Sequence, residues 1–396
     1  MMLRSGSPDS RSFEGVQRGV VLVVLGAVAF GITYADHAPL IPLIARDLGL
    51  DDVQSGLLST ALFLAYLGAT LLLVGVADRA GPKRSVGVGL ALASAGAAVF
   101  GFAPAYPVAL AGKALEGLGS ALAFVSATRY IAAVYGPRRS HFALGLYGAG
   151  FPLGSALALI LMPTLAVTLG GWRQAIGIEA ALIAGCAYLW TKAPAVTHIS
   201  APGDMRDALR CVDCWFASLQ HAAGFGLALA SGTWITVYLL REFSLPLTLS
   251  GLLGSLLLDL AVLARALGGW LLAREHIRTK FVMRAGDISI ITGVVLLALP
   301  ARPLPVALAG AVLVGIGVGL PYSAVFNSAA ASLPSAPAAA QGLAAVGGTA
   351  GVMIGAPVMG FAVQTFGFSS AWAFVGAIAS VALAATFLMR GEEELV

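Results

Sequence analysis

The second half of this sequence repeats the first in outline. The tetrapeptide Ser-Gly-Leu-Leu that begins at Ser55 recurs at Ser250, a register of 195 residues (250 − 55). Carried on without a gap, the register aligns Arg79 with Arg274, each just after a long apolar run. Internal repeats of this size in an apolar chain are typical of secondary transporters, which hold their substrate between two related halves. The repeat therefore predicts a membrane protein built from two related halves.

The composition supports insertion in a membrane. Hydrophobic residues make up 59% of the 396 residues and charged residues 11%, against about 45–50% and about 25% in soluble domains. Apolar runs over 19–34, 57–77 and 86–105 are long enough, or nearly so, to cross a bilayer. The 49 glycines suit helices that approach closely in lipid. A soluble fold is therefore excluded.

Counting the apolar runs predicts twelve helices and an all-α membrane protein. The most polar interruption, 192–213, is the expected linker between an N-terminal six-helix bundle, 1–191, and a C-terminal six-helix bundle, 214–396. No separate soluble domain is expected. The expected spans are 17–45, 54–77, 85–105, 107–135, 141–170, 172–191, 214–240, 249–273, 281–300, 304–331, 337–366 and 369–390.

The basic residues predict the orientation. If the N-terminus is cytoplasmic, sixteen Lys and Arg residues fall in cytoplasmic segments, and the opposite side holds only Arg46, Arg173, Arg241 and Arg302. This asymmetry places both termini in the cytoplasm. We therefore expect a multi-pass protein of a prokaryotic-type inner (plasma) membrane. The net charge of +4 then reflects topology, and no nucleic-acid partner is expected. We expect a monomer, because a complete cavity forms within one such chain.

The loop after the second span resembles a family signature, the Gly-x-x-x-Asp-Arg-x-Gly-x-Lys/Arg-Lys/Arg motif of the major facilitator superfamily. The residues that carry it are Gly75-Val-Ala-Asp78-Arg79-Ala-Gly81-Pro-Lys83-Arg84. The leading glycine stands one place late, and the second copy, Gly269-Trp-Leu-Leu-Ala273-Arg274, has lost the acid. The resemblance covers essentially the whole chain. It implies the twelve-helix facilitator fold of two pseudo-symmetric bundles, and it says almost nothing about substrate.

The resemblance also implies a gate at the cytoplasmic mouth. Asp78 and Arg79 are the expected gate residues, because ion pairs that break and re-form can bias rocking halves between two states. We place Arg129, for which Asp78 is a plausible partner, and Arg274 with them. The alternative is that the loop's cations only set topology, and both roles can hold together.

Charged residues inside the spans carry sharper information about function. Each costs at least about 2.5–3.5 kcal/mol at the bilayer centre unless it is paired or hydrated. The residues concerned are Asp36, Lys113, Glu116, Asp259 and Arg265, and Arg129 and Glu179 rank second because they lie nearer the helix ends. We expect them to line a cavity, to pair with each other, or to do both. For Lys113 and Glu116, three residues apart, an intrahelical pair is the simpler explanation.

Arg265 is the first candidate for substrate contact. Its segment, Ala264-Arg265-Ala266-Leu267-Gly268-Gly269-Trp270, resembles the eighth helix of nitrate/nitrite porters, where an arginine before Gly-Gly-Trp faces the anion. A guanidinium binds two oxygens of nitrate or of a carboxylate at once. Those porters use a second arginine in the second helix, where this chain has Thr70. The alternative is that Arg265 only neutralises Asp259 or another acid.

Other polar residues complete the expected binding and coupling sites. Gln220, Trp234, Tyr322 and Asn327 are further candidates for the cavity wall. Proton coupling needs an acid or a histidine that can gain and lose a proton inside the cavity. Asp36 with His37 is the first choice, followed by Asp259 and Glu116. Alternatively, Asp36 caps a helix break before Pro39 and His37 only donates a hydrogen bond.

No cofactor, metal or catalytic site is expected. Cys211 and Cys214 have the spacing of some zinc and redox sites, but no second pair accompanies them. The glycine repeats have helical spacing and do not resemble phosphate-binding loops. The protein is therefore not expected to be an enzyme.

The sequence as a whole predicts a secondary transporter for a small anion, such as nitrate, nitrite or a small carboxylate, coupled to protons and working by alternating access. The first alternative is proton-driven efflux of lipophilic or drug-like compounds, with the cavity acids as ligands. The second is a transporter-like sensor that binds without transport. The exact substrate and the direction of transport are not predicted.

Overall fold

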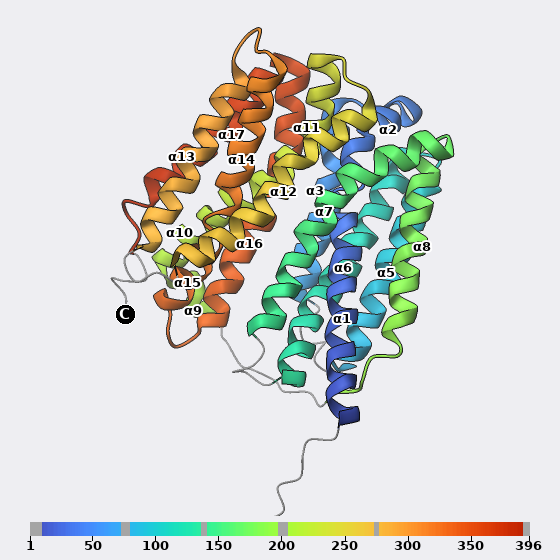
Figure 1. Cartoon of the computed structure of the whole chain (residues 1–396), viewed down its shortest axis with the longest axis vertical. Helices are drawn as coiled ribbons and strands as arrows, with labels where there is room; N and C mark the ends of the chain where they lie inside the picture. Colours follow the sequence, from blue (N-terminus) through green and yellow to red (C-terminus); the bar gives the residue numbers. More distant parts are fainter. Residues whose placement is uncertain (1–9, 73–79, 136–140, 197–204, 273–276, 391–396) are drawn as a thin grey trace, which may run out of the picture.

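The computed structural model describes residues 10–72, 80–135, 141–196, 205–272 and 277–390, and within these ranges it contains helices and no strands. The helices form two groups that lie side by side (Figure 1). The first group comprises α1 (Ser10–Thr33), η1 (Ala38–Leu40), α2 (Ile41–Leu48), α3 (Asp52–Leu72), α5 (Pro82–Gly101), α6 (Tyr106–Tyr135), α7 (His141–Leu169) and α8 (Trp172–Trp190).

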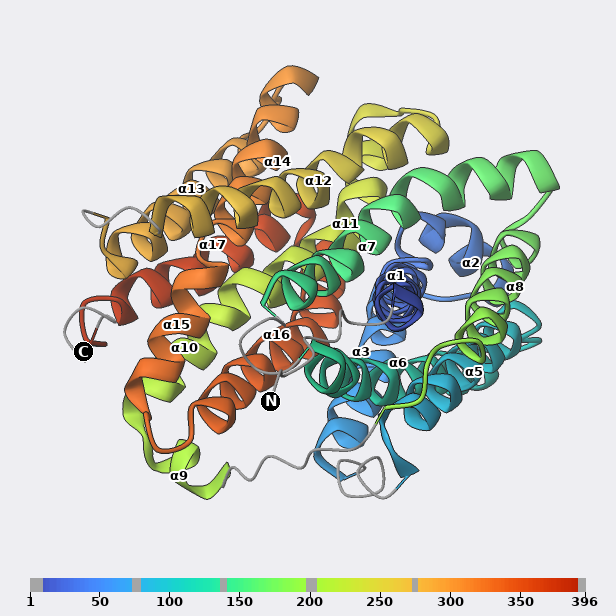
Figure 2. The same cartoon turned by 60° about the horizontal axis from the view of Figure 1, so that its bottom comes forward.

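The second group follows the expected linker, which holds the six-residue helix α9 (Met205–Arg210). Its other elements are α10 (Val212–His221), η2 (Ala222–Gly226), α11 (Leu227–Phe243), α12 (Leu247–Leu272), α13 (Thr279–Ala298), α14 (Leu304–Gly319), α15 (Tyr322–Ser332), α16 (Pro337–Phe366) and α17 (Phe368–Ala385). We call the end of the molecule with the start of α1 and with α9 the linker end, and the other end, with α2, the far end (Figures 1 and 2).

Eleven stretches of the described residues are long and apolar enough to cross a membrane. The twelfth expected span, 172–191, is helix α8. At 19 residues α8 has the necessary length, but Arg173, Gln174 and Glu179 make it more polar than the others. The number of helices expected from the apolar runs is therefore found in the structure, together with one unusually polar member.

Three of the expected spans are interrupted by a break or an irregular turn. The span 17–45 breaks after Thr33 and resumes at η1, with Pro39 near the break. The span 304–331 breaks at Leu320 and Pro321, because proline lacks the N–H that a helix interior needs. The span 214–240 contains η2, a π-helical turn. The break before Pro39 agrees with the alternative interpretation of Asp36 given above.

Glycine contacts repeat across the two halves and confirm the internal symmetry. A Cβ atom at Gly117 in α6 would collide with the carbonyl oxygen of Leu62 in α3, and one at Gly315 in α14 would collide with that of Leu257 in α12. The register is 195 for the leucines (257 − 62) and 198 for the glycines (315 − 117). The repeat seen at Ser55 therefore extends through the fourth helix of each half, with a shift of three residues.

The same helices also meet through paired glycines. Gly89 of α5 lies against Gly119 of α6, and Gly286 of α13 lies against Gly317 of α14. Small residues at these crossings let the helix backbones touch, which is how helices associate in lipid. The two halves therefore have the same internal packing.

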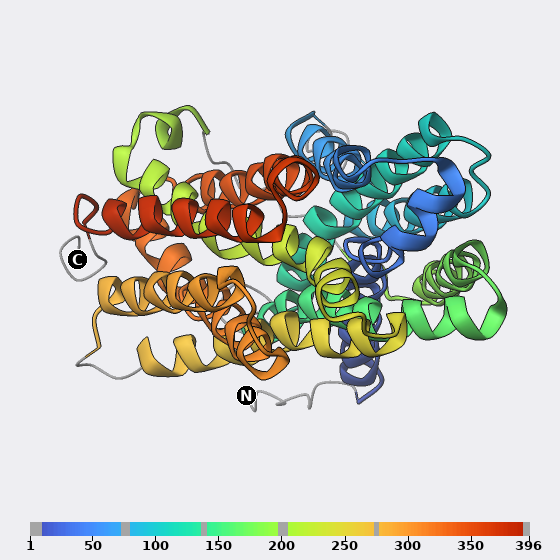
Figure 3. The same cartoon turned by 90° about the horizontal axis from the view of Figure 1, so that it is seen from above.

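The two halves meet closely towards the far end (Figure 3). Gly56 of α3 contacts the backbone of Ala356 and Pro357 in α16, and Gly251 of α12 contacts Leu159 in α7. Asp52 at the start of α3 pairs with Arg241 of α11, with Nη2 and Oδ1 2.7 Å apart. Together these contacts hold the far end closed.

Two glycines of the first half have no close neighbour towards the linker end. A Cβ atom at Gly68, three turns beyond Gly56 on α3, would have no atom within 4 Å, and the same holds at Gly148 on α7. These two positions therefore lack the close backbone contacts that Gly56 and Gly251 make towards the far end.

Replacing Gly117 with alanine should lower the melting temperature of the purified protein. The new methyl group would overlap the Leu62 carbonyl oxygen, and overpacking of this kind costs about 1–3 kcal/mol. Gly177→Ala in α8 is the matched control, because a Cβ atom there meets nothing within 4 Å. Equal melting temperatures for the two variants would contradict this account of helix packing.

Candidate functional site

Arg265 projects from α12 into the region between the two halves. Its guanidinium carbon lies 4.4 Å from the ring centre of Tyr322 in α15 and 5.2 Å from that of Phe151 in α7. Phe151 belongs to the first half and Tyr322 to the second. Contacts of this kind hold a guanidinium by cation–π attraction and keep it away from water. Both halves therefore contribute to the surroundings of this one charge.

Two nitrogens of Arg265 lack hydrogen-bond partners. Nε and Nη1 are buried, and no acceptor among the described residues reaches them. The alternative expected from the sequence, a pair with Asp259, is not found among these residues, because the carboxylate of Asp259 accepts a hydrogen bond of 2.9 Å from Ser255 Oγ. A buried guanidinium without a carboxylate costs free energy, which an anionic ligand would offset.

The aromatic contacts of Arg265 close into a ring, which we call the Arg265 box: Arg265, Tyr322, His221, Phe225 and Phe151. The rings of His221 and Tyr322 are 6.1 Å apart, and the His221 ring stacks on Phe225 at 5.5 Å. Phe225 in turn lies 5.5 Å from Phe151, which returns to Arg265. The sequence predicted Arg265 and Tyr322 here, whereas Phe151 and Phe225 were missed.

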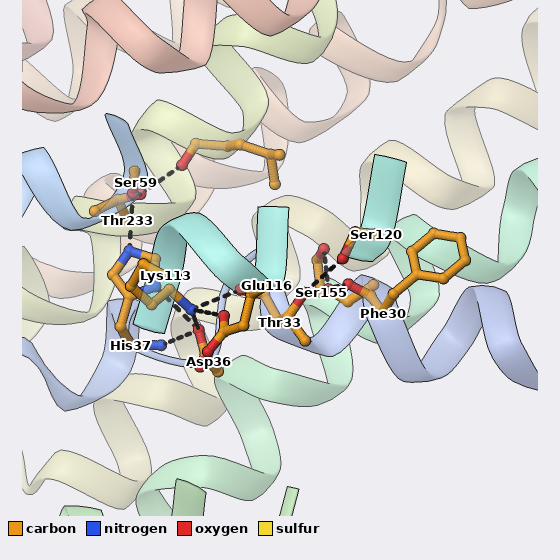
Figure 4. A network of polar contacts seen from close by, with 12 residues as sticks. Phe30, Thr33, Asp36, His37, Ser59, Lys113, Glu116, Ser120, Ser155 and Thr233 are labelled. Atoms are coloured by element: carbon orange, nitrogen blue, oxygen red, sulfur yellow. Dashed lines mark hydrogen bonds and ion pairs between the residues drawn. The ribbon is translucent and has the colours of Figure 1, made fainter. Parts of the chain in front are cut away.

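A second cluster of charges is buried in the first half, where α1 breaks (Figure 4). The ammonium group of Lys113 in α6 lies 2.6 Å from Asp36 Oδ1, forms an ion pair with Glu116, and donates to the Thr33 carbonyl oxygen at 3.0 Å. Thr33 ends α1, so its carbonyl is left free by the break. Asp36, Lys113 and Glu116 are all 0% exposed. The lysine therefore holds the broken helix against α6.

Glu179 of α8 adds a third carboxyl group to this cluster. Its side chain is buried and lies close enough for electrostatic interaction with Asp36, Glu116 and Lys113. Neither of its oxygens has a hydrogen-bond partner among the described residues. From the sequence alone, Glu179 ranked second among the charges inside the spans and was given no coupling role. An acid in an apolar span was the signal, and it was the same signal that pointed to Asp36.

His37 extends this cluster to the second half of the molecule. Its Nδ1 lies 3.0 Å from Asp36 Oδ1, and its Nε2 lies 2.8 Å from Ser59 Oγ in α3. Ser59 Oγ is 3.4 Å from Thr233 Oγ1 in α11 (Figure 4). A chain of polar atoms therefore runs from Lys113 to the interface between the halves. We call Asp36, His37, Lys113, Glu116 and Glu179 the acidic cluster.

The remaining candidates lie elsewhere. Gln220 donates to Asp287 and to the Ala382 carbonyl inside the second half, and Trp234 donates to the Ala356 carbonyl at 2.9 Å. These two side chains are engaged in helix packing, so we leave them out of the substrate site proposed below. Asn327 is exposed on α15.

The gate residues are described only in part. Asp78, Arg79 and Arg274 lie outside the described residues. Arg129 is half-buried in the last two turns of α6. The gate therefore stays a prediction.

Replacing Lys113 with methionine should strongly destabilise the protein, because three buried carboxyl groups would lose their only lysine. Breaking a buried pair in this way costs about 3–5 kcal/mol. We expect a lower melting temperature, partly restored when Asp36→Asn and Glu116→Gln are added. Lys192→Met is the control, since Lys192 is exposed beside the Tyr188 ring. A melting temperature unchanged by Lys113→Met would contradict the role of the ion pairs.

Comparison with known proteins gives the family. A sequence profile described as the Major Facilitator Superfamily matches residues 22–339. One curated relative is "Probable nitrate/nitrite antiporter NarK1" of Thermus thermophilus, 28% identical over 371 residues, covering 83% of this chain and 80% of that protein. Another is "Probable sulfoacetate transporter SauU" of Cupriavidus necator, 25% identical over 309 residues, covering 70% of this chain and 69% of that protein.

The solved structures agree with this result. A bacterial homologue of the human lysosomal transporter Spinster, in an inward-facing and occupied conformation, superposes with a TM-score of 0.76 at 18% identity and covers 97% of each chain. At this identity the likeness shows the fold alone, and it confirms the all-helical membrane fold expected from the sequence. The profile match extends over most of the chain, so this protein belongs to the major facilitator superfamily.

Proposed function

We propose that this transporter carries a small anion, of the nitrate, nitrite or small-carboxylate kind, and binds it at Arg265. One observation carries the proposal: a guanidinium between the two halves has two buried nitrogens without a partner among the described residues. In a facilitator-type transporter the substrate lies near the bilayer midplane between the halves. The planar guanidinium can donate two parallel hydrogen bonds to the oxygens of one anion.

The relatives support an anion as the substrate. The curated names of two of them include nitrate/nitrite and sulfoacetate, which are all anions. At 28% and 25% identity they favour the class of substrate and do not single out one member. The nitrate porters that the sequence resembles have a second arginine, and here Thr70 donates to the Tyr66 carbonyl at 2.9 Å instead. A carboxylate, which one guanidinium can hold, therefore ranks beside nitrate.

One observation favours the alternative, efflux of lipophilic compounds. Within the first half, Phe151 contacts the ring of Tyr34, which contacts Phe63, and Phe63 in turn contacts Tyr66. Such a wall can bind an apolar or cationic body through its ring faces. A lipophilic substrate would not need the free nitrogens of Arg265, so the two functions differ in their dependence on this side chain.

The acidic cluster is the proposed site of proton coupling. Three carboxyl groups share one lysine in a site shielded from water, so full ionisation would leave an excess of negative charge. Binding a proton offsets that excess. The polar chain through His37, Ser59 and Thr233 links the cluster to the other half, so its protonation can favour one arrangement of the halves.

The topology proposed from the sequence fits this function. We place the linker end, and with it both termini, in the cytoplasm of a cell with a prokaryotic-type inner membrane, in keeping with the distribution of basic residues. The division into 1–191, 192–213 and 214–396 and the monomeric state belong to the same proposal. The gate formed by Asp78, Arg79, Arg129 and Arg274 is also part of this proposal.

Arg265→Ala should abolish stabilisation of the purified protein by its anion. A ligand at about 100 times its dissociation constant stabilises by about 2.7 kcal/mol, which a thermal-shift assay detects. The panel comprises nitrate, nitrite, acetate and sulfoacetate, with tetraphenylphosphonium as a lipophilic cation. Arg265→Lys should bind with intermediate affinity, because it keeps the charge and loses the planar fork.

Arg284→Ala is the matched control for this assay. Arg284 bonds to Thr386 and stacks on Phe387, so its loss should leave anion binding intact. Stabilisation of wild type by tetraphenylphosphonium alone, kept in Arg265→Ala, would favour lipophilic efflux. Equal anion binding by wild type and Arg265→Ala would overturn the anion site.

Asp36→Asn should weaken the coupling of transport to protons. In proteoliposomes we expect the variant to exchange labelled anion across the membrane but to accumulate less of it in a pH gradient than wild type, because Asn cannot carry a proton. Asp47→Asn, at the far end where Asp47 pairs with Arg173, is the control. Full pH-driven accumulation in Asp36→Asn would remove Asp36 from the coupling mechanism.

A further inference from the structure

His221 is the second buried group of the Arg265 box with an unused polar atom. Its side chain is 7% exposed, and Nε2 has no hydrogen-bond partner among the described residues. The ring lies close enough to Arg265 for their charges to interact, and both side chains contact the ring of Tyr322. Three free buried nitrogens, Nε and Nη1 of Arg265 and Nε2 of His221, therefore belong to one box.

The local backbone is built to hold this histidine. His221 ends α10, and the π-helical turn η2 begins at the next residue. Such turns often mark functional sites in helices. Opposite, Gly348 of α16 leaves room for the ring, because a Cβ atom there would collide with His221 Nδ1. Figure 2 shows α10 running beside α15 and α16, the helices that supply these contacts.

The hydrogen bond of Nδ1 fixes the tautomer of His221. Nδ1 lies 3.0 Å from the Ala344 carbonyl oxygen, which can only accept, so Nδ1 carries the hydrogen. In the neutral ring Nε2 then holds a lone pair, which repels an anion. Once protonated, Nε2–H donates and the ring carries a positive charge. The histidine can therefore bind an anion only together with a proton.

We propose that His221 is the second ligand of the transported anion, alongside Arg265, and that each anion bound in the box takes up one proton on His221. The proposal rests on the anion site proposed above. It adds a second proton, bound beside the substrate, to the one proposed at the acidic cluster. It names the substrate class more closely: an anion with at least two acceptor atoms, one for the guanidinium and one for the imidazolium.

The neighbouring ionisable groups leave His221 free for this role. Arg265 and Tyr322 face it from α12 and α15. Helices α16 and α17 carry no Asp, Glu, Lys, Arg or His in their described ranges. Asp287 of α13 is engaged by Gln220, and Asp213 of α10 is paired with Arg390. Within the described residues, no carboxylate therefore competes with an incoming anion for the His221 ring.

The test is isothermal titration calorimetry of the purified full-length protein with nitrate, nitrite, acetate or sulfoacetate. Titrations at one pH in two buffers of different ionisation enthalpy give the number of protons taken up for each anion bound. For wild type we expect uptake that approaches one proton at high pH. The affinity should fall by about tenfold per pH unit above the pKa of the histidine in the free protein, because binding requires the protonated ring.

Two variants separate the proton from the hydrogen bond. His221→Asn keeps a donor for the Ala344 carbonyl and removes Nε2, so it should lose proton uptake and weaken binding by about tenfold to a hundredfold. His221→Gln places an uncharged amide near Nε2, so it should lose proton uptake and bind independently of pH. Trp215→Phe, on the exposed side of α10, is the control and should behave like wild type.

The outcomes distinguish this proposal from the function on which it rests. Anion binding that needs Arg265 but shows no proton uptake in wild type would overturn the role of His221 and keep the anion site. The same follows if both His221 variants fold and keep wild-type proton uptake. If wild type binds none of the four anions, or Arg265→Ala binds them equally well, the anion site fails and this proposal fails with it.

Discussion

Direct contact between helix backbones at glycine is the constraint on which the rest of this structure depends. Helices in lipid gain little from burying apolar side chains against each other, so close packing has to hold them together. Gly117 against Leu62 and Gly315 against Leu257 bring the inner helices of each half into backbone contact by the same means. At the far end Gly56 and Gly251 do so between the halves. Large side chains such as Lys113 and Arg265 lie among helices packed in this way.

The fold could be predicted largely from the sequence, because apolar runs and a 195-residue register are local or repeated signals. The span expected at 337–366 is helix α16 from end to end. The interruptions were predictable in part, since the breaks near Pro39 and Pro321 each lie beside a proline. The π-helical turn after His221 lies in an apolar run without a proline, and it packs against the neighbouring α16.

Some residues of the candidate site could likewise be predicted from the sequence, whereas others could be found only from the fold. Arg265 and Asp36 stood out because a charge in an apolar run is visible in the sequence alone. Phe151 and Phe225 did not, since aromatic residues are common in such runs. Only the fold brings these two rings, from different halves, into contact with each other and Phe151 against the guanidinium of Arg265. The acidic cluster likewise unites α1, α6 and α8, whose pairing no register predicts. The charged residues of the site could be recognised from the sequence, whereas their contacts with residues on other helices could not.

The contact between Ser59 and Thr233 has a further consequence, since it is the point where the polar chain of one half touches the other. Any movement that parts α3 from α11 would remove one neighbour of Ser59 and free its hydroxyl to turn. The hydroxyl that His37 contacts would then have one neighbour fewer once the two helices part. A movement between the halves is thereby linked, through Ser59 and His37, to the buried carboxylate of Asp36.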